Sequence, residues 1–543
     1  MSGFFRCKKV PVAQPFRAAH AAVDGPEGLR YGTWRGVFKP VRQAGAVALA
    51  ALLGTAAGAA SGDLRLIDAV KARDVDAVRG LLKAQPAPDV NAAAGDGATA
   101  LHWAAHRDDL AIADLLIRAG ARASVANDAG ATPLHLACTN RSAAMVERLL
   151  DAGANPNAAL LNGETVLMTC ARTGDAGAVT ALLRRGAAVD AREHAHRQTA
   201  LMWAAAERHA DVVRLLIAAH ADIRARSLVY EQTVVDEQTQ RAGREALNYT
   251  VKRGGATPLL FAARSGDLAS AQLLLDAGAD ANDAQPDGVS ALVLAAHSGH
   301  GAVAALLLDH GADANALAGG YTPLHAAVLR SDEALVRALL AHGADPDLRL
   351  ARGTPLRRDT TDWNLPKTLV GATPYLLAAK FLEPEILTTL AAAGADPRLT
   401  MPDGTDALML AAGIGSSRAA SRRGIETIDF GKVEPESRVR DTVAAVLARS
   451  ANVNATSRTG DSALHIAAAL GYDTVVQLLV DRGANVNVKN ARGVTPLAAA
   501  MSGSIGGGRS AATPAGADLL GFEPAVTLAH PSTVALLRKL GAT

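Results

Sequence analysis

Short apolar runs alternate with tight polar turns along most of the chain, at a repeated spacing. In residues 320–347, GYTPLHAAVLRSDEALVRALLAHGADPD, apolar residues recur twice at helical spacing on either side of a polar turn at Ser331 and Asp332. Thr322 and Pro323 are typical of a helix start, and Gly343 is typical of a helix end. The segment therefore predicts two short helices joined by a tight turn.

The same pattern recurs along the chain. It is read again in ATALHWAAHRDD, ATPLHLACTNRS, ATPLLFAARSGD, VSALVLAAHSGH and DSALHIAAALGY, which start at residues 98, 131, 256, 289 and 461. Where nothing is inserted the period is about 33 residues. One such unit cannot bury its apolar side alone, so the units are expected to stack. The repeated pattern therefore predicts an all-α solenoid over residues 61–543. It has about twelve units, including an atypical cap at each end.

The period and the T-P-L-H-x-A core of these units resemble the ankyrin-repeat family. The resemblance implies that the first helix of each unit lines a concave face and that the second lines a convex face. It also implies that the turns between units project as a row of fingers. For function it implies a binding scaffold for another protein, with no catalytic residues and no cofactor.

Four insertions interrupt the period, at about residues 224–254, 348–370, 413–438 and 502–528. The first two enlarge fingers, whereas the third and fourth lie between the two helices of a unit. Loops of this length in a compact array are typical of functional or disordered segments. The first two contain residue types that dominate binding hot spots, so they supply candidate protein-binding residues, namely Tyr230, Tyr249, Arg357, Arg358 and Trp363. The alternative is that the aromatic side chains pack their own loops onto the solenoid.

Exposed positions near the end of the first helix of each unit form a second candidate set. In the family that the chain resembles, such positions and the fingertips contact ligands. The fingertip candidates lie at residues 127–128, 194–197 and 285–287. The helix-end candidates are His106, Arg107, Arg172, Glu207, Arg208, Arg264, His297, Arg330 and Phe381.

Composition and charge narrow the possible chemistry. The chain is 49% hydrophobic but only 3% aromatic, which favours a core of Ala, Leu and Val between closely stacked helices. The net charge is +2, and because residues 1–43 contribute +6, the remainder carries −4. With no basic stripe visible along the sequence, we expect no nucleic-acid surface. The chain also lacks a nucleophile elbow, a zincin helix and a His/Cys set at metal-binding spacing, so no metal site is expected.

Histidine and cysteine occur at repeated structural positions. His102, His135, His325 and His465 share the T-P-L-H position, where a ring bonded to the Thr and backbone of its own turn is expected. Cys138 and Cys170 fall on the first helices of neighbouring units. Stacked helix axes lie about 8–10 Å apart, whereas bridged Cα atoms are usually less than about 7 Å apart. We therefore expect two buried thiols, with a disulfide as the alternative.

The first 60 residues form a leader. Residues 44–60, AGAVALAALLGTAAGAA, follow Lys39 and Arg42 and resemble a secretory signal with cleavage near residues 59–61. This segment is too short for a stable membrane span. The 40 residues before it do not belong in a signal peptide, which makes Val37 a candidate for the true start, as in some bacterial genes.

These patterns predict an exported, monomeric scaffold of bacterial type that binds a protein partner and is periplasmic or secreted. The alternative location is the cytoplasm, with the leader as an unprocessed linker. The alternative functions are an enzyme or enzyme accessory with chemistry in the insertions, and a secreted host-directed effector.

Overall fold

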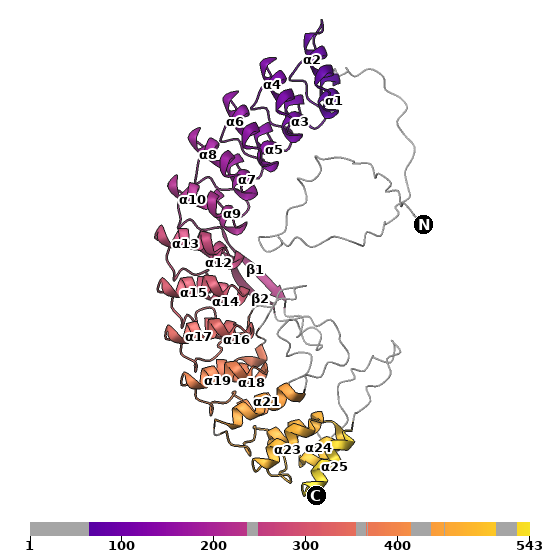
Figure 1. Ribbon diagram of the computed structural model, residues 1–543, viewed down its shortest axis with the longest axis vertical. Helices are drawn as coiled ribbons and strands as arrows, with labels where there is room; N and C mark the ends of the chain where they lie inside the picture. Colours follow the sequence, from indigo (N-terminus) through magenta and orange to yellow (C-terminus); the bar gives the residue numbers. More distant parts are fainter. Residues whose placement is uncertain are drawn as a thin grey trace, which may run out of the picture.

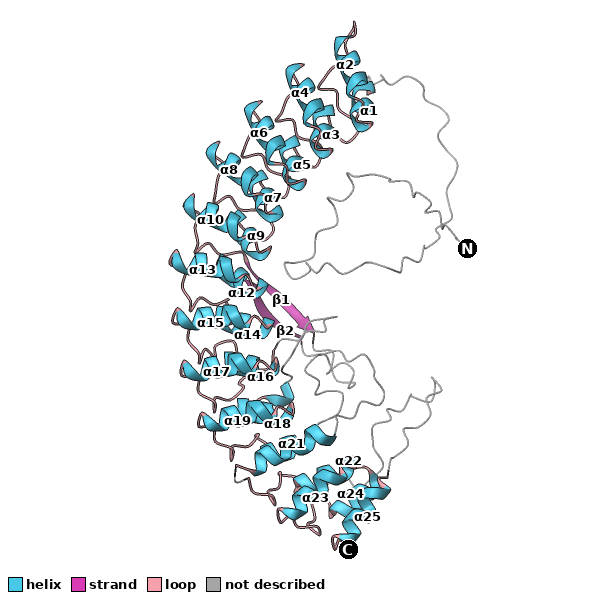
Figure 2. Ribbon diagram, viewed as in Figure 1, coloured by secondary structure: helices cyan, strands magenta, loops and turns pink. Residues whose placement is uncertain are grey.

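A computed structural model describes residues 64–235, 248–354, 365, 367–413, 436–449, 451–505 and 529–543. The leader lies outside the described residues, as do Arg357, Arg358 and Trp363. Twelve helix pairs in the described part of the chain stack into one curved array (Figures 1 and 2). The predicted all-α solenoid of twelve units is confirmed.

The first helix of each pair lies on the concave side over most of the arc (Figure 1). These inner helices are α1 (Arg65–Lys71), α3 (Ala100–His106), α5 (Pro133–Thr139), α7 (Val166–Thr173), α9 (Ala200–Ala206), α12 (Pro258–Ser265), α14 (Ala291–Ser298), α16 (Pro323–Leu329), α18 (Pro374–Lys380), α20 (Ala407–Ala411), α22 (Ala463–Leu470) and α24 (Pro496–Ser502).

The second helix of each pair lies on the convex side. These outer helices are α2 (Val75–Lys83), α4 (Leu110–Arg118), α6 (Ala143–Asp151), α8 (Ala176–Arg184), α10 (Ala210–Ala218), α13 (Leu268–Asp276), α15 (Gly301–Asp309), α17 (Glu333–Ala341), α19 (Pro384–Ala392), α21 (Glu436–Leu447), α23 (Asp473–Asp481) and α25 (Pro531–Lys539).

The local signals of one unit act as the sequence predicts. The hydroxyl of Thr322 accepts the backbone N–H three residues later at 3.3 Å, and Pro323 occupies the first position of α16. The carboxylate of Asp332 caps α17 in the same way at 3.0 Å. Ser331 makes the turn between the helices with φ 57°, and Gly343 ends α17 with φ 81°. The ends of both helices are therefore set by bonds within the unit itself.

Four buried histidines, His102, His135, His325 and His465, join neighbouring units and are called the histidine ladder below. In each ring Nδ1 accepts the backbone N–H of the residue that caps the helix, at 3.1–3.2 Å. Nε2 donates to a backbone carbonyl of the next unit at 2.9–3.5 Å. Burial lowers the pKa of all four rings, to about 4 for His135 and His325. The predicted structural role of these residues is confirmed, with the inter-unit bond as an addition.

Asparagines after the G-A-[DN] stops make a second series of inter-unit bonds. Asn282 donates to the carbonyl of Gly311 at 3.1 Å and accepts the N–H of Asp313 at 2.7 Å. Arg224 and Arg398 take the equivalent place in two units, where a guanidinium has no acceptor atom and cannot form the reciprocal pair. The same pair of bonds is made by Asn91, Asn157, Asn315, Asn454 and Asn487.

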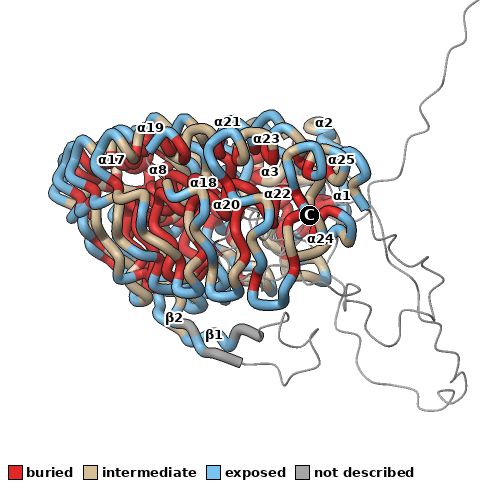
Figure 3. The backbone as a smooth tube through the Cα atoms, turned by 90° about the horizontal axis from the view of Figure 1, so that it is seen from below, coloured by how far each residue is buried: buried red, intermediate tan, exposed pale blue. Residues whose placement is uncertain are grey.

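The core runs without interruption between the two layers of helices. Figure 3 shows the buried backbone along the middle of the stack and exposed backbone at its edges. Inner helices carry fully buried alanines, such as Ala104 and Ala105, while outer helices contribute larger residues such as Leu116. Small side chains let neighbouring inner helices approach closely. The predicted Ala, Leu and Val core is therefore confirmed.

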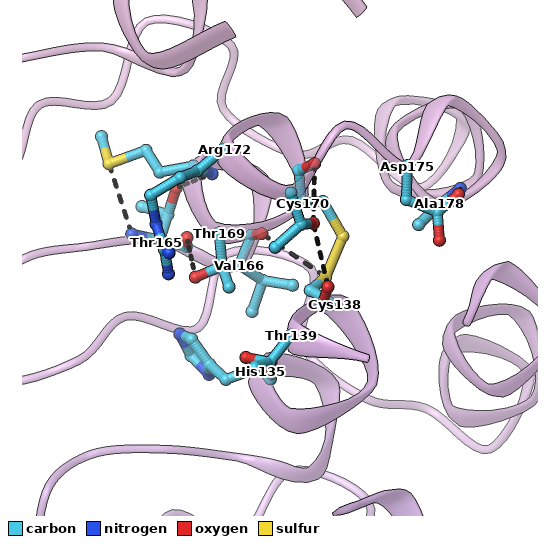
Figure 4. The surroundings of a disulfide bond; sticks show 12 residues. His135, Cys138, Thr139, Thr165, Val166, Thr169, Cys170, Arg172, Asp175 and Ala178 are labelled. Carbon is cyan, nitrogen blue, oxygen red and sulfur yellow. Dashed lines mark hydrogen bonds between the residues drawn. A yellow bond between two sulfur atoms is a disulfide. The ribbon is translucent and has the colours of Figure 1, made fainter. Parts of the chain in front are cut away.

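Cys138 and Cys170 form a disulfide between α5 and α7, with Cα atoms 4.7 Å apart (Figure 4). The expectation of two buried thiols is therefore wrong. Each Cα lies about 2.3 Å from its helix axis, so residues on facing sides of two stacked helices approach much more closely than the axes do. The hydroxyl of Thr173 also donates to the carbonyl of Cys138 at 2.9 Å, which adds a second link between these units.

The insertions differ in what the structure describes. The ends of the first form an antiparallel hairpin of β1 (Val229–Val235) and β2 (Asn248–Gly254), the one sheet among the described residues. At the neck of the second, Thr354 and Leu365 exchange two hydrogen bonds, before the 3-10 helix η2 (Lys367–Leu369). The third separates α20 from α21 and the fourth separates α24 from α25, as predicted.

Candidate protein-binding surface

The concave side carries a row of basic side chains at the ends of the inner helices. Each residue lies in the last turn of an inner helix or in the turn after it. The places of these residues differ by up to two positions from unit to unit, and acids such as Asp108 and Glu207 lie beside some of them in the sequence. The prediction that the chain has no nucleic-acid surface stays a prediction. This basic row consists of Arg107, Arg141, Arg172, Arg208, Arg264, Arg330 and Lys380.

Some members of the row lie over aromatic rings of the inner helices. The guanidinium of Arg172 is 5.6 Å from the ring centroid of Trp203 and 3.4 Å from the carboxylate of Glu164. The guanidinium of Arg264 is 5.8 Å from the ring centroid of Phe261 in its own helix. Such stacking holds the charged group over the helix face while its end remains accessible.

The aromatic residues themselves were not among the predicted site residues. Trp103, Trp203 and Phe261 occupy the fourth position of their helices, in ALHW, ALMW and PLLF. Lys71 lies over the Trp103 ring at 4.6 Å, which repeats the arrangement in the first units. The shared position of these bulky residues within the repeat was a signal that could have identified them.

The predicted histidines of the helix ends are half-buried and contact rings. His106 meets Trp103 edge to face, with centroids 5.8 Å apart. Burial, followed by the charge of Arg107, lowers the pKa of His106. His297 lies 5.8 Å from the ring of Tyr321. Both histidines therefore pack against aromatic rings at the ends of the inner helices.

The other helix-end candidates differ in exposure. Arg107 and Arg208 are exposed, and Glu207 beside Arg208 is half-buried. The guanidinium of Arg330 donates to the carbonyl of Ser298 in the preceding unit at 3.4 Å.

Burial affects Lys380 of the basic row and the helix-end candidate Phe381 that follows it. At the far end of the row, it lowers the pKa of Lys380 to about 8. Phe381 is only 9% exposed and belongs to the core, so its prediction as a surface residue is wrong. Arg438 of the longer helix α21 packs on the turn directly after Phe381, where it donates to the carbonyl of Leu382 at 2.8 Å and pairs with Glu383 at 3.0 Å.

The β1–β2 hairpin extends one finger beside the inner helices (Figure 1). Tyr230 lies opposite Arg253 in the pairing and its ring is 6.3 Å from that of His196, a predicted fingertip residue. Tyr249 pairs with Val234 in the backbone register, which places it farther from the base of the hairpin. The two tyrosines predicted from the sequence therefore lie at different heights on one hairpin.

Arginines at one repeat position clamp the bases of the two enlarged fingers. Arg226 donates to the carbonyls of Gly255 and Ala284 at 2.8 and 3.1 Å and pairs with the buried carboxylate of Asp283. Arg349 donates to the carbonyls of Gly371 and Thr400 at 2.7 and 2.8 Å. Each arginine thus joins its finger to the next one. These residues were also missed, because their role depends on carbonyls that only the fold places nearby.

In the described ranges, every helix is too short or too polar to cross a bilayer. Within the same ranges, no group of three or more His, Cys, Asp or Glu side chains is placed to hold a metal ion. The features of the described part that remain for the candidate surface are its basic residues, its aromatic rings and the β1–β2 hairpin.

Comparison with known proteins agrees with this architecture. The family model for ankyrin repeats (3 copies) matches residues 66–159, 145–227, 259–349 and 436–507, which together make up more than half of the chain. The chain is also 31% identical over 196 residues to the B-cell lymphoma 3 protein homolog of Mus musculus. That alignment covers 33% of this chain and 40% of the mouse protein, so the chain spans less than half the length of this relative. The chain belongs to the ankyrin-repeat family.

Proposed function

We propose that the chain is a non-enzymatic, exported scaffold that holds another protein against its concave face and its enlarged fingers. Ankyrin repeats are generally modules of protein–protein interaction. The observation that carries the proposal is the series of basic residues at the ends of inner helices, of which Arg172 and Arg264 lie over aromatic rings. Arg and aromatic side chains dominate binding hot spots, and stacked rings hold the cations in place before a partner arrives.

Export is supported by two independent features. The Cys138–Cys170 disulfide links two inner helices, and disulfides persist mainly in oxidising compartments. The leader has the three parts of a secretory signal. The native protein should therefore begin after residues 59–61 and should carry no alkylatable thiol at positions 138 and 170. Amino-terminal sequencing and mass spectrometry measure both, and a chain that begins at Met1 contradicts export.

The binding face is tested by capture of partners from native cells with the full chain. Replacing Arg107 and Arg208 by Gln removes two exposed charges from the concave side. Replacing Arg118 and Arg184 by Gln removes two exposed charges from the ends of outer helices and serves as the matched control. We expect the concave variant to lose its partner and the convex variant to keep it. Equal loss or equal retention contradicts binding on the concave face.

The second enlarged finger has its own test. This insertion contains the predicted contact residues Arg357, Arg358 and Trp363. A variant with all three replaced by Ala should lose the partner while circular dichroism shows unchanged helix content. Retention of every partner by that variant removes this insertion from the binding face.

A further inference from the structure

Neighbouring fingers are joined at their tips by single backbone hydrogen bonds. The N–H of His194 donates to the carbonyl of Asn162 in the preceding finger at 2.8 Å. The N–H of Leu228 donates to the carbonyl of His196 at 2.6 Å in the same way. A finger of ordinary length therefore has a bonded neighbour at its tip.

The β1–β2 hairpin extends beyond this series of bonds. Leu228 directly precedes β1, and among the described residues none from Val229 to Val235 bonds the backbone of a neighbouring finger. Within the described ranges, β1 and β2 pair only with each other, in a two-stranded sheet. Figure 3 shows both strands standing out from the edge of the stack. Alternate residues of β1 therefore direct their N–H and C=O groups toward an edge that no described strand occupies.

The two edges of the hairpin differ in how well they resist a further strand. Natural edge strands are protected by charged side chains, above all Lys, by Pro and by bulges. β2, NYTVKRG, carries Lys252 and Arg253 and ends at Gly254. β1, VYEQTVV, consists of Val, Tyr, Gln and Thr with Glu231 as its one charge. The composition of β1 is therefore typical of a strand that pairs on both edges, whereas that of β2 is typical of a protected edge.

Apolar side chains are exposed at the base of β1. Leu228 is 39% exposed and Val229 is 45% exposed. Directly before them, Ser227 and Ala256 exchange two hydrogen bonds of 3.0 Å across the neck of the hairpin. A two-stranded hairpin is at best marginally stable in water, and a third strand adds backbone bonds and apolar cover. Because the neck already positions β1, a partner does not have to order it.

The edge of β1 adjoins the candidate binding surface. β1 lies on the side of the hairpin toward α9, and β2 lies on the side toward α14 (Figure 1). The ring of Tyr230 at the base of β1 is 6.3 Å from the ring of the fingertip residue His196. A chain segment along this edge is therefore continuous with a partner on the concave face.

We propose that the outer edge of β1 binds an extended segment of the protein partner, which pairs with it as a third strand. Backbone hydrogen bonds supply the affinity, and side chains at alternate positions of the segment supply the specificity. This inference rests on the proposed function and specifies how the first enlarged finger binds the partner.

β2 shows which residues β1 accepts as neighbours. In the pairing, Lys252 is opposite Glu231 and Thr250 is opposite Thr233. Like charges directly opposite each other destabilise a sheet. The partner segment therefore carries no Asp or Glu opposite Glu231, and it carries β-branched or aromatic residues on either side of that position.

Fluorescence anisotropy with the full chain tests the proposal. The probe is a labelled peptide that follows the β2 pattern, Thr-Tyr-Thr-Val-Lys-Val-Thr. The control peptide is methylated on two adjacent central amide nitrogens, which keeps its side chains but removes a donor from each of its edges. We expect the methylated peptide to bind about tenfold more weakly, or by about 1.4 kcal/mol, because backbone pairing carries the binding.

Two matched variants identify the edge. Thr233 of β1 and Thr250 of β2 are directly opposite each other, and both are exposed. Thr233→Lys places a charge on β1, and Thr250→Lys places the same charge on β2. We expect Thr233→Lys to weaken binding of the Lys-containing probe about fivefold and Thr250→Lys to leave it unchanged. Circular dichroism confirms that each variant is folded.

Hydrogen exchange measured by mass spectrometry gives a second readout. The bound probe should slow amide exchange more in β1 than in β2, because only the outward amides of β1 gain partners. Absence of binding, equal binding of the methylated peptide, or an equal effect of the two Lys variants overturns the proposal.

Two other outcomes are distinguished by the same variants. A concentration-dependent dimer of the full chain that is seen by analytical ultracentrifugation and lost in Thr233→Lys assigns the edge to a second copy, and overturns the proposal. If the native partner is lost with the Arg107/Arg208 variant but kept with Thr233→Lys, the scaffold function stands and this inference fails.

Discussion

Lowering the pH from 7 to 5 is expected to destabilise the solenoid through the histidine ladder. Burial holds the pKa of His135 and His325 at about 4, against an ordinary value of 6.5. Between these values the unfolded chain takes up protons that the folded chain does not, so the free energy of unfolding rises with pH. The stabilisation is fully present above pH 6.5 and is lost as the pH falls toward 4.

The magnitude follows from the two pKa values. For one ring with a pKa of 6.5 unfolded and about 4 folded, the free energy of unfolding falls by about 2 kcal/mol between pH 7 and pH 5. His135 and His325 together contribute about 4 kcal/mol. Burial also lowers the pKa values of His102 and His465, which act in the same direction.

The matched control comes from the chain itself. Met168 occupies the ladder position in α7, where its sulfur accepts the backbone N–H of Thr165 at 3.4 Å. A His135→Met/His325→Met variant therefore puts Met at the ladder position of two units, where the α7 unit already has it. It should lose about 1 kcal/mol per missing inter-unit bond at pH 7. Its stability should then fall by about 4 kcal/mol less than that of the wild type on going to pH 5.

Urea unfolding followed by circular dichroism at pH 7, 6 and 5 measures this difference on the full chain. The slope of the free energy of unfolding against urea concentration must be the same for both proteins. A repeat array can unfold in segments, and a different slope would mean that different parts unfold. If the variant loses stability as steeply as the wild type between pH 7 and pH 5, the histidine ladder is not the source of the acid sensitivity.

Two further changes test the links between units. Replacing Cys138 and Cys170 by Ser should lower the free energy of unfolding by about 4 kcal/mol for a closed loop of this length, measured by urea unfolding; adding a reductant to this variant should change nothing further. Replacing Arg226 by Met leaves the buried carboxylate of Asp283 without its cation and should cost about 2 kcal/mol. Limited proteolysis should then cut the hairpin faster, while the exposed neighbour Arg224→Met serves as the control.

Much of the architecture was predictable because it is encoded within single units. Thr322 and Asp332 cap their helices through bonds that span three residues, and Gly343 ends one through its own φ angle. Such local signals can be recognised in the sequence. Repetition then implies stacking, since no single unit can bury its apolar side. The unit count and the inter-helical places of the last two insertions followed from the same pattern.

The binding surface was only partly predictable. The helix-end arginines were identified, but their contacts were not, because the ring that Arg172 lies over and the carbonyl that Arg330 bonds belong to other repeats. Phe381 was assigned to the surface, and the sequence did not show that Arg438 of the longer helix α21 packs on the turn directly after it. The hairpin was recognised as an enlarged finger, yet neither its strand register nor the unpaired edge of β1 was visible.

The sequence by itself determined the repeat, its helix boundaries, its core residues and the places where it is interrupted, because those properties depend on contacts a few residues apart. Tertiary structure decided which distant side chains meet. It brought Cys138 to Cys170, joined the histidine ladder to carbonyls of the next unit, and placed the carbonyl of His196 beside the base of the hairpin. The physical reason is that these contacts depend on the distance and rotation between stacked units, and the hydrophobic pattern of one unit does not specify either quantity.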